Sequence, residues 1–199
     1  MLNVTSQKKM KLNKLRNKAY RTAINHGWHE QELSNEHCLC LVISELMEAV
    51  EADRKNKHAD IDVFNYIIQD TLHQPQLSDQ ELKSAYTAAF LTYIKDTVED
   101  EMSDACIRLF DYAGLKNIDL DDYDYKGSDT EDYTELTFTE SMFCIIKYIT
   151  DGFYQYEPQI ILNEIFAFCK SRNIAIMWHI KKKMMFNTLR EYRHGSKAY

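Results

Sequence analysis

Four carboxylates could do chemistry in this sequence, because they form two pairs with the same spacing. Glu45 and Glu48 lie three residues apart, and Glu101 and Asp104 repeat that spacing farther along the chain. Residues three apart share one face of a helix, so each pair would present its two carboxylates side by side. Hard carboxylate oxygens without Cys or His ligands suit Mg²⁺, with Mn²⁺ as an alternative. The two pairs are therefore the candidate metal ligands.

The surroundings of these pairs are more informative than their spacing, since the chain has 31 acidic residues and several such pairs would arise by chance. Each pair interrupts an apolar stripe at helical spacing, formed by Leu41 and Ala52 in one case and by Ile94, Val98, Ala105 and Leu109 in the other. A buried carboxylate without a partner is costly or becomes protonated. We therefore expect the pairs to face each other across a cation. The alternative is solvated helix faces with local ion pairs, such as Asp104 with Arg108.

The elements that would position these residues are long helices. Only 5 Gly and 2 Pro occur in 199 residues, too few for the many turns of a β-rich fold. We predict one all-α domain over residues 1–199. Apolar periodicity predicts helices over residues 5–26, 34–56, 60–71, 80–113, 138–151, 158–171 and 174–193. Residues 116–136 are rich in Asp and Tyr and lack a helical stripe, so we predict an acidic, mobile loop there.

Charge and hydropathy narrow the class of partner. The net charge of -7 argues against nonspecific binding to nucleic acid. No apolar stretch has the length needed to span a bilayer, and no signal peptide is visible, so we expect no membrane partner. The five cysteines mostly fall in apolar helical patterns, which is typical of reduced core thiols and indicates a cytoplasmic protein.

The two carboxylate motifs resemble those of the MazG-like, all-α NTP pyrophosphatase superfamily, in which an ExxE helix is followed by an ExxD helix. Members related to dimeric dUTPases also carry a late KxxxNxxR helix, and Lys183, Asn187 and Arg190 match that pattern. One departure concerns the 52 residues between Glu48 and Glu101, more than the family usually places there. We interpret the excess as an inserted short helix near residues 60–71 and a lengthened start to the next helix.

The resemblance implies a Mg²⁺-dependent enzyme that hydrolyses a nucleoside triphosphate to the monophosphate and pyrophosphate. It implies that the four carboxylates hold the metal, that Glu48 or Glu45 activates the attacking water, and that the KxxxNxxR residues bind phosphates. In family members an aromatic residue near the position of Trp28 stacks on the base, although the sequence slightly favours Trp28 as a residue that packs the loop onto the core. The family closes a half-open helical bundle by self-association, so we expect a homodimer or a higher homo-oligomer.

Two other functions use similar sequence features. A di-iron carboxylate bundle needs two Glu-x-x-His motifs, and only Glu191 and His194 have that spacing. A helical interaction module could share the fold and lack the chemistry, and this is the main alternative. In the enzyme reading, we expect residues 193–199 to close over the bound substrate.

Overall fold

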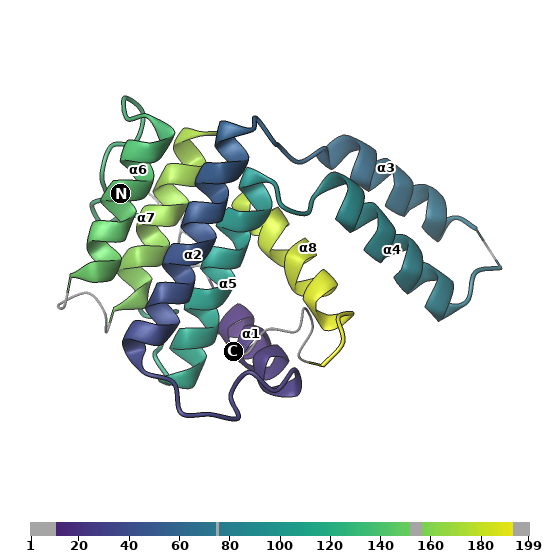
Figure 1. Ribbon diagram of the computed structural model, residues 1–199, viewed down its shortest axis with the longest axis horizontal. Coiled ribbons are helices and arrows are strands. Elements are labelled where there is room, and N and C mark those ends of the chain that lie inside the picture. The colour runs from purple at the N-terminus through teal and green to yellow at the C-terminus, as the bar shows by residue number, and fades with distance from the viewer. Residues whose placement is uncertain (1–10, 75, 152–156, 193–199) are drawn as a thin grey trace, which may run out of the picture.

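The computed structural model describes residues 11–74, 76–151 and 157–192, and these residues confirm the all-α prediction. Helices are the regular elements of this part of the chain, which contains no strand (Figure 1). They are α1 (Asn13–Asn25), α2 (Asn35–Arg54), α3 (Ile61–Leu72), α4 (Asp79–Tyr93), α5 (Val98–Leu115), α6 (Phe138–Thr150), α7 (Pro158–Ser171) and α8 (Ile176–Thr188). The predicted start of the first helix, before residue 11, and the predicted closing segment 193–199 lie outside the described residues.

Helix α5 is the centre of the bundle, where α1, α2, α7 and α8 pack against it. Its apolar residues, including Met102, Leu109 and Phe110, are fully buried in the main core. Thr97 caps the helix by accepting a hydrogen bond from the Asp100 N–H at 3.3 Å. The first turn is acidic, which complements the positive end of the helix dipole. The carboxylates of α5 therefore start from a well-capped, buried helix.

The prediction of one helix over residues 80–113 was wrong, because the chain breaks between α4 and α5. Asp96 has φ +59°, a left-handed conformation that a continuous α-helix does not allow. The Thr97 hydroxyl donates to the Ile94 carbonyl at 2.6 Å and holds the turn together. Ile94 consequently packs in a separate cluster and does not extend the apolar stripe of α5.

The residues between the two carboxylate motifs form a helical hairpin, made of α3 and α4, which we call the arm. In Figure 1 the arm projects from the bundle, and the C-terminal helix α8 lies at its base. A second hydrophobic cluster joins the two, since Phe64 and Phe90 of the arm pack with Phe186 of α8. The Phe90 and Phe186 rings stack with their centroids 4.4 Å apart. The insertion expected from the sequence is thus two helices that pack on α8.

The acidic segment 116–136 has no helix or strand, as predicted, and is attached to the bundle near both ends. Leu120 is fully buried near its start, and the Leu120 N–H donates to the Asn13 side chain of α1 at 2.9 Å. Near its end, the buried Tyr133 hydroxyl donates to Glu164 Oε2 at 2.7 Å. The mobility of the segment stays a prediction.

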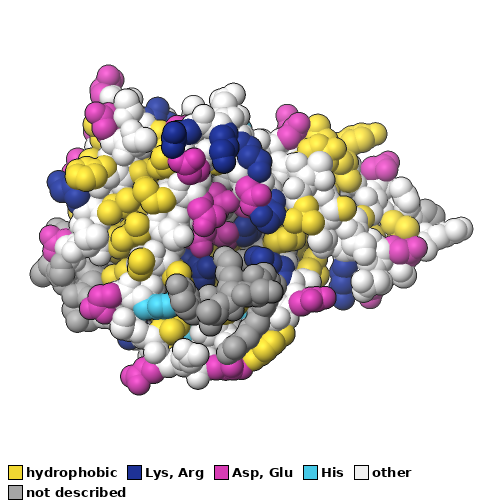
Figure 2. Space-filling model, viewed as in Figure 1, with side chains coloured by type: hydrophobic (Ala, Val, Ile, Leu, Met, Phe, Trp, Pro, Cys, Tyr) yellow, Lys and Arg dark blue, Asp and Glu magenta, His cyan; other side chains and the backbone are white. Residues whose placement is uncertain are grey.

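The described helices include none with both the length and the apolar character needed to cross a membrane. Acidic and basic side chains instead gather side by side on one face, over α2, α5 and α8 (Figure 2). That face contains the candidate site.

Candidate functional site

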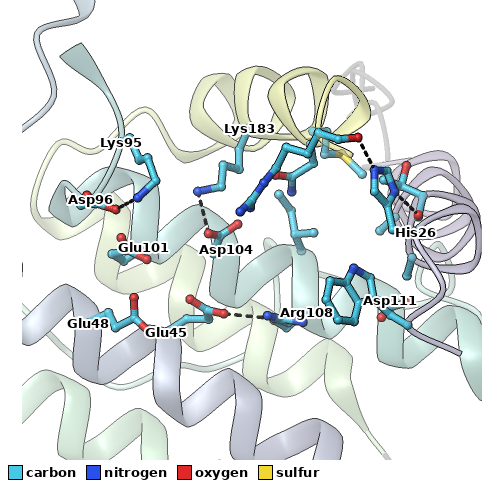
Figure 3. Close-up of a pocket in the computed structure, with 18 residues that line it drawn as sticks. His26, Glu45, Glu48, Lys95, Asp96, Glu101, Asp104, Arg108, Asp111 and Lys183 are labelled. Carbon is cyan, nitrogen blue, oxygen red and sulfur yellow. Dashed lines mark hydrogen bonds and ion pairs between the residues drawn. The ribbon is translucent and has the colours of Figure 1, made fainter. Parts of the chain in front are cut away.

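A cavity of about 170 Å³ lies between α1, α2, α5 and α8, and all eight residues proposed from sequence line it (Figure 3). They are Trp28, Glu45, Glu48, Glu101, Asp104, Lys183, Asn187 and Arg190. These residues come from segments up to 162 positions apart, since Trp28 and Arg190 lie at opposite ends of the chain. The fold therefore brings the three sequence motifs together at one place.

Three of the four predicted carboxylates form a cluster in this cavity. Glu45, Glu101 and Asp104 each offer one oxygen, and these oxygens all lie within 4.8 Å of one another. The side chains of Ala49 and Ala105, one turn beyond Glu45 and Glu101, are small and fully buried, which lets α2 and α5 approach closely. Glu48 lines the same cavity but is exposed, and its carboxylate lies outside the cluster.

Burial and mutual repulsion raise the pKa values in this cluster. Loss of solvation, followed by the charge on Asp104, raises the pKa of Glu45 to about 7. Loss of solvation, followed by the charges on Asp104 and Asp100, raises the pKa of Glu101 to about 8. The Glu101 carboxylate has no hydrogen-bond or ion-pair partner among the described residues. At neutral pH it needs a proton or a cation, so the all-oxygen cluster fits a hard divalent ion.

Lys183 lies against the other side of the cluster. Its ammonium group is 2.6 Å from Asp104 Oδ2 and 2.7 Å from Asp100 Oδ2, and only 4% of the residue is exposed. Burial alone would lower the pKa of Lys183, but the charges of Asp104 and Asp100 raise it above its ordinary value. Lys183 is therefore a charged counter-ion of two carboxylates, whereas the sequence motif predicts contact with phosphates.

Sequence reasoning missed Asp100, which is the innermost carboxylate of the site. Its side chain is 1% exposed, and its Oδ1 atom has no partner among the described residues. Burial raises the pKa of Asp100 to about 6 although Lys183 opposes the shift. A signal was present in the sequence, because Asp100 precedes Asp104 by one helical turn and shares its face.

Arg108 joins the two carboxylate helices. Its Nε atom lies 3.1 Å from Glu45 Oε1, so the ion pair links α5 to α2. The local pair of Arg108 with Asp104, considered from the sequence, is not found among the ion pairs of the described residues, where Asp104 pairs with Lys183. Glu45 thus pairs with Arg108 and Asp104 pairs with Lys183, whereas Glu101 has no cationic partner in the part of the chain that the structure describes.

The opposite end of the cavity is formed by α1 and the end of α8. His26 is buried there, with Nδ1 2.7 Å from the Thr22 carbonyl oxygen and Nε2 2.9 Å from the Arg190 carbonyl oxygen. This bridge holds the end of α8 beside α1 and places Arg190 at the cavity wall. Trp28, which follows α1 in the chain, is half-buried and lines the same cavity.

Asn187 completes the α8 side of the wall, one turn beyond Lys183. Its Oδ1 atom is buried and has no partner among the residues described. Lys183 and Asn187 of α8, with Arg190 just past its end, thus place two positive charges and one unsatisfied amide oxygen on the cavity wall, and the Lys183 charge is paired with Asp100 and Asp104. The break between α4 and α5 adds Lys95 and Asp96, which pair with each other at the rim.

No family model, curated protein or solved structure matches this chain. What the cavity can do must therefore be inferred from its own chemistry. A cluster of acidic oxygens beside fixed cations can hold a divalent ion and an anionic ligand at the same time.

Proposed function

We propose that this protein is a Mg²⁺-dependent nucleoside triphosphate pyrophosphohydrolase. The observation that carries the proposal is the cluster of Glu45, Glu101 and Asp104, whose oxygens lie within 4.8 Å in a cavity that also contains Lys183 and Arg190. Hydrolysis of a phosphoric anhydride requires neutralised phosphate oxygens and a water held in line with the bond that breaks. The cavity contains groups suited to both tasks.

Glu45, Glu101 and Asp104 would hold the ion, because their oxygens converge and the unpaired Glu101 carboxylate needs a positive charge. A bound Mg²⁺ supplies charge neutralisation on the phosphate oxygens, and Mn²⁺ could take its place. Arg108 keeps Glu45 directed toward the cluster through its 3.1 Å ion pair.

The cationic face of α8 would bind the phosphates. Arg190 presents a guanidinium group to the cavity, and Lys183 can leave Asp104 for a phosphate oxygen while it keeps its bond to Asp100. The Asn187 amide can donate to a phosphate or sugar oxygen. Trp28, at the α1 end, would stack on the base.

Glu48 is our candidate for the residue that orients the water and accepts its proton. It lies one turn from Glu45 on the same cavity wall, and it is exposed and outside the cluster, so its carboxylate is free to face solvent. Glu45, by contrast, has one oxygen engaged by Arg108 and belongs to the cluster. The two glutamates, which the sequence does not distinguish, would therefore have different roles.

These two roles predict different kinetic defects. We expect Glu48→Gln to lower kcat by about 100-fold or more, as for loss of a general base, with little change in Mg²⁺ affinity. Glu45→Gln should weaken Mg²⁺ binding by about tenfold or more, because it removes a charged ligand. Calorimetric titration of Mg²⁺ into each variant, together with kcat at saturating Mg²⁺, separates the two. Reversal of the two phenotypes would exchange the assigned roles.

Pyrophosphate release tests the function itself. Purified protein should release pyrophosphate from at least one ribo- or deoxynucleoside triphosphate when Mg²⁺ or Mn²⁺ is present, and none when the metal is chelated. Glu101→Gln is the inactive control. Release of orthophosphate would place the attack at another phosphorus and refute the proposal, and inactivity on the full panel with both metals would favour a helical interaction module.

Self-association and a cytoplasmic location stay predictions. Light scattering tests the first of these.

A further inference from the structure

A second cavity, of about 730 Å³, lies between the arm and the side of α8 that faces away from the candidate site. We call it the arm groove. Ten residues line it: Ile68, Thr71, Leu72, Leu82, Lys83, Tyr86, Trp178, Lys181, Lys182 and Met185. Its volume falls in the range of pockets that bind small molecules, and its wall is largely aliphatic and aromatic. Leu72 and Met185 are 66% and 43% exposed, so apolar surface is open to solvent here.

The charged residues of the arm groove all have the same sign. Lys83, Lys181 and Lys182 line it, and no Asp or Glu does. None of the three lysines forms an ion pair with a carboxylate in the described part of the chain. Three unneutralised cations beside an apolar cavity are notable in a protein with a net charge of -7. They favour a ligand that carries a negative charge.

The two hydroxyl groups of the groove are already used within the protein. The Thr71 hydroxyl donates to the Ile67 carbonyl at 2.8 Å, and the Tyr86 hydroxyl donates to the Lys182 carbonyl at 2.8 Å. The groove thus offers apolar contact and ammonium groups. A matching ligand has an apolar body and an anionic head.

The size of the groove favours a small ligand over a protein surface. Ten lining residues are fewer than the roughly 20 to 30 that each partner contributes to a stable protein–protein interface. From Trp178 to Met185 the groove follows α8 for seven residues, or roughly 10 Å of helix, which an extended alkyl chain can span. We propose that the arm groove binds a free single-chain anionic amphiphile, with its chain along Trp178 and Leu72 and its head group between the lysines.

The groove and the candidate site share α8. Lys182 and Lys183 are consecutive residues, and the first lines the groove while the second lines the catalytic cavity. A ligand in the groove would therefore fasten α8 to the arm and stabilise the folded protein in proportion to its affinity. This proposal does not depend on the proposed enzymatic function.

The test uses dodecanoate below its micellar concentration, followed by calorimetry and by tryptophan fluorescence, to which Trp178 in the groove contributes. We expect one molecule to bind per chain, octanoate to bind more weakly, and the cationic dodecyltrimethylammonium to bind at least about tenfold more weakly. The double variant Lys83→Glu/Lys181→Glu should lose about tenfold or more in dodecanoate affinity. The matched control is Lys55→Glu/Lys126→Glu, which makes the same change in net charge at exposed positions outside the groove and should bind as the wild type does.

Substitutions in the apolar wall of the arm groove test where the alkyl chain of the ligand lies. Leu72→Glu should abolish dodecanoate binding, whereas Leu91→Glu, on an exposed position of the same arm and outside the groove, should not. Equal binding of the cationic and anionic amphiphiles, or equal affinity in both double variants, would overturn the proposal. Binding to anionic vesicles without binding of monomeric dodecanoate would mean that the arm groove docks on a membrane surface and not on a free amphiphile. Loss of a dimer in the Leu72→Glu variant would mean that the arm groove is an interface between two copies of the protein.

Discussion

Replacing Glu101 with glutamine is expected to raise the melting temperature of the metal-free protein by roughly 6 to 12 °C and to abolish pyrophosphate release. The two effects have one cause. Glu101 is 4% exposed, and burial, followed by the charges on Asp104 and Asp100, raises its pKa to about 8. Without a cation, the folded protein must therefore either keep a proton on Glu101 or hold a buried, uncompensated charge.

The pH dependence of this effect has a defined sign. The pKa of Glu101 is about 8 in the folded protein and 4.5 in the unfolded reference, so the folded state binds the proton more tightly. Its stabilising contribution is fully present below pH 4.5 and is lost as pH rises through 8. By pH 7 the loss is on the order of 3 kcal/mol, and each kcal/mol moves the melting temperature by about 2 to 4 °C in a protein of this size. Glutamine does not titrate, so the Glu101→Gln variant does not lose this stability as the pH rises.

Thermal melts of the metal-free proteins between pH 5 and pH 9 provide the measurement. The gap between Glu101→Gln and the wild type should widen toward high pH, and saturating Mg²⁺ should close it by stabilising the wild type alone. Glu51→Gln serves as the control, since Glu51 is an exposed residue of α2 whose partner is Arg54. A variant that melts below the wild type at every pH would mean that Glu101 forms a structural contact, which would remove the main argument for a metal site.

The features predicted correctly from sequence depend on helical periodicity, which is a local property. The pairs Glu45/Glu48 and Glu101/Asp104 follow from their spacing. The helix α8 carries two of the three residues of the KxxxNxxR motif, and the third, Arg190, lies just past its end. The shared cavity also follows, because carboxylates on apolar stripes must face one another when those stripes pack.

The features that sequence did not predict depend on turns and on long-range partners. Apolar periodicity continues through residues 94–97, but the left-handed Asp96 and the cap at Thr97 end one helix and begin another. A Thr three residues before Asp100 was the available signal for a helix start. The pairing of Arg108 with Glu45 across helices could not be read from spacing, since the same-helix partner Asp104 is equally well placed in sequence.

Lys183 is the residue whose role changed most between sequence and structure, and its removal should have the second large effect. The ammonium group touches both Asp100 and Asp104 at 2.7 and 2.6 Å. Methionine keeps the length and apolar character of the side chain and removes the charge. Asp100, 1% exposed and with Oδ1 already without a partner among the described residues, would then be a buried carboxylate with no cation beside it.

We expect Lys183→Met to destabilise the metal-free protein by about 3 to 5 kcal/mol, which is the cost of removing one partner of a buried ion pair. Chemical denaturation measures this loss directly. Lys181→Met is the matched control, since it makes the same substitution on the same helix at an exposed position without an ion pair to the described carboxylates. Its free energy of unfolding should change by less than about 0.5 kcal/mol.

A second substitution identifies the cause of the loss. If the unpaired charge on Asp100 is responsible, Asp100→Asn in the Lys183→Met background should recover a large part of the stability, although each single variant is destabilised. Saturating Mg²⁺ should also recover part of it, because a divalent ion on Asp104 lowers the negative charge that Lys183 neutralises in the metal-free protein. Pyrophosphate release should still be impaired in Lys183→Met after this recovery, since a phosphate contact would be missing. A double variant no more stable than Lys183→Met would show that the unpaired charge on Asp100 is not the cause of the loss.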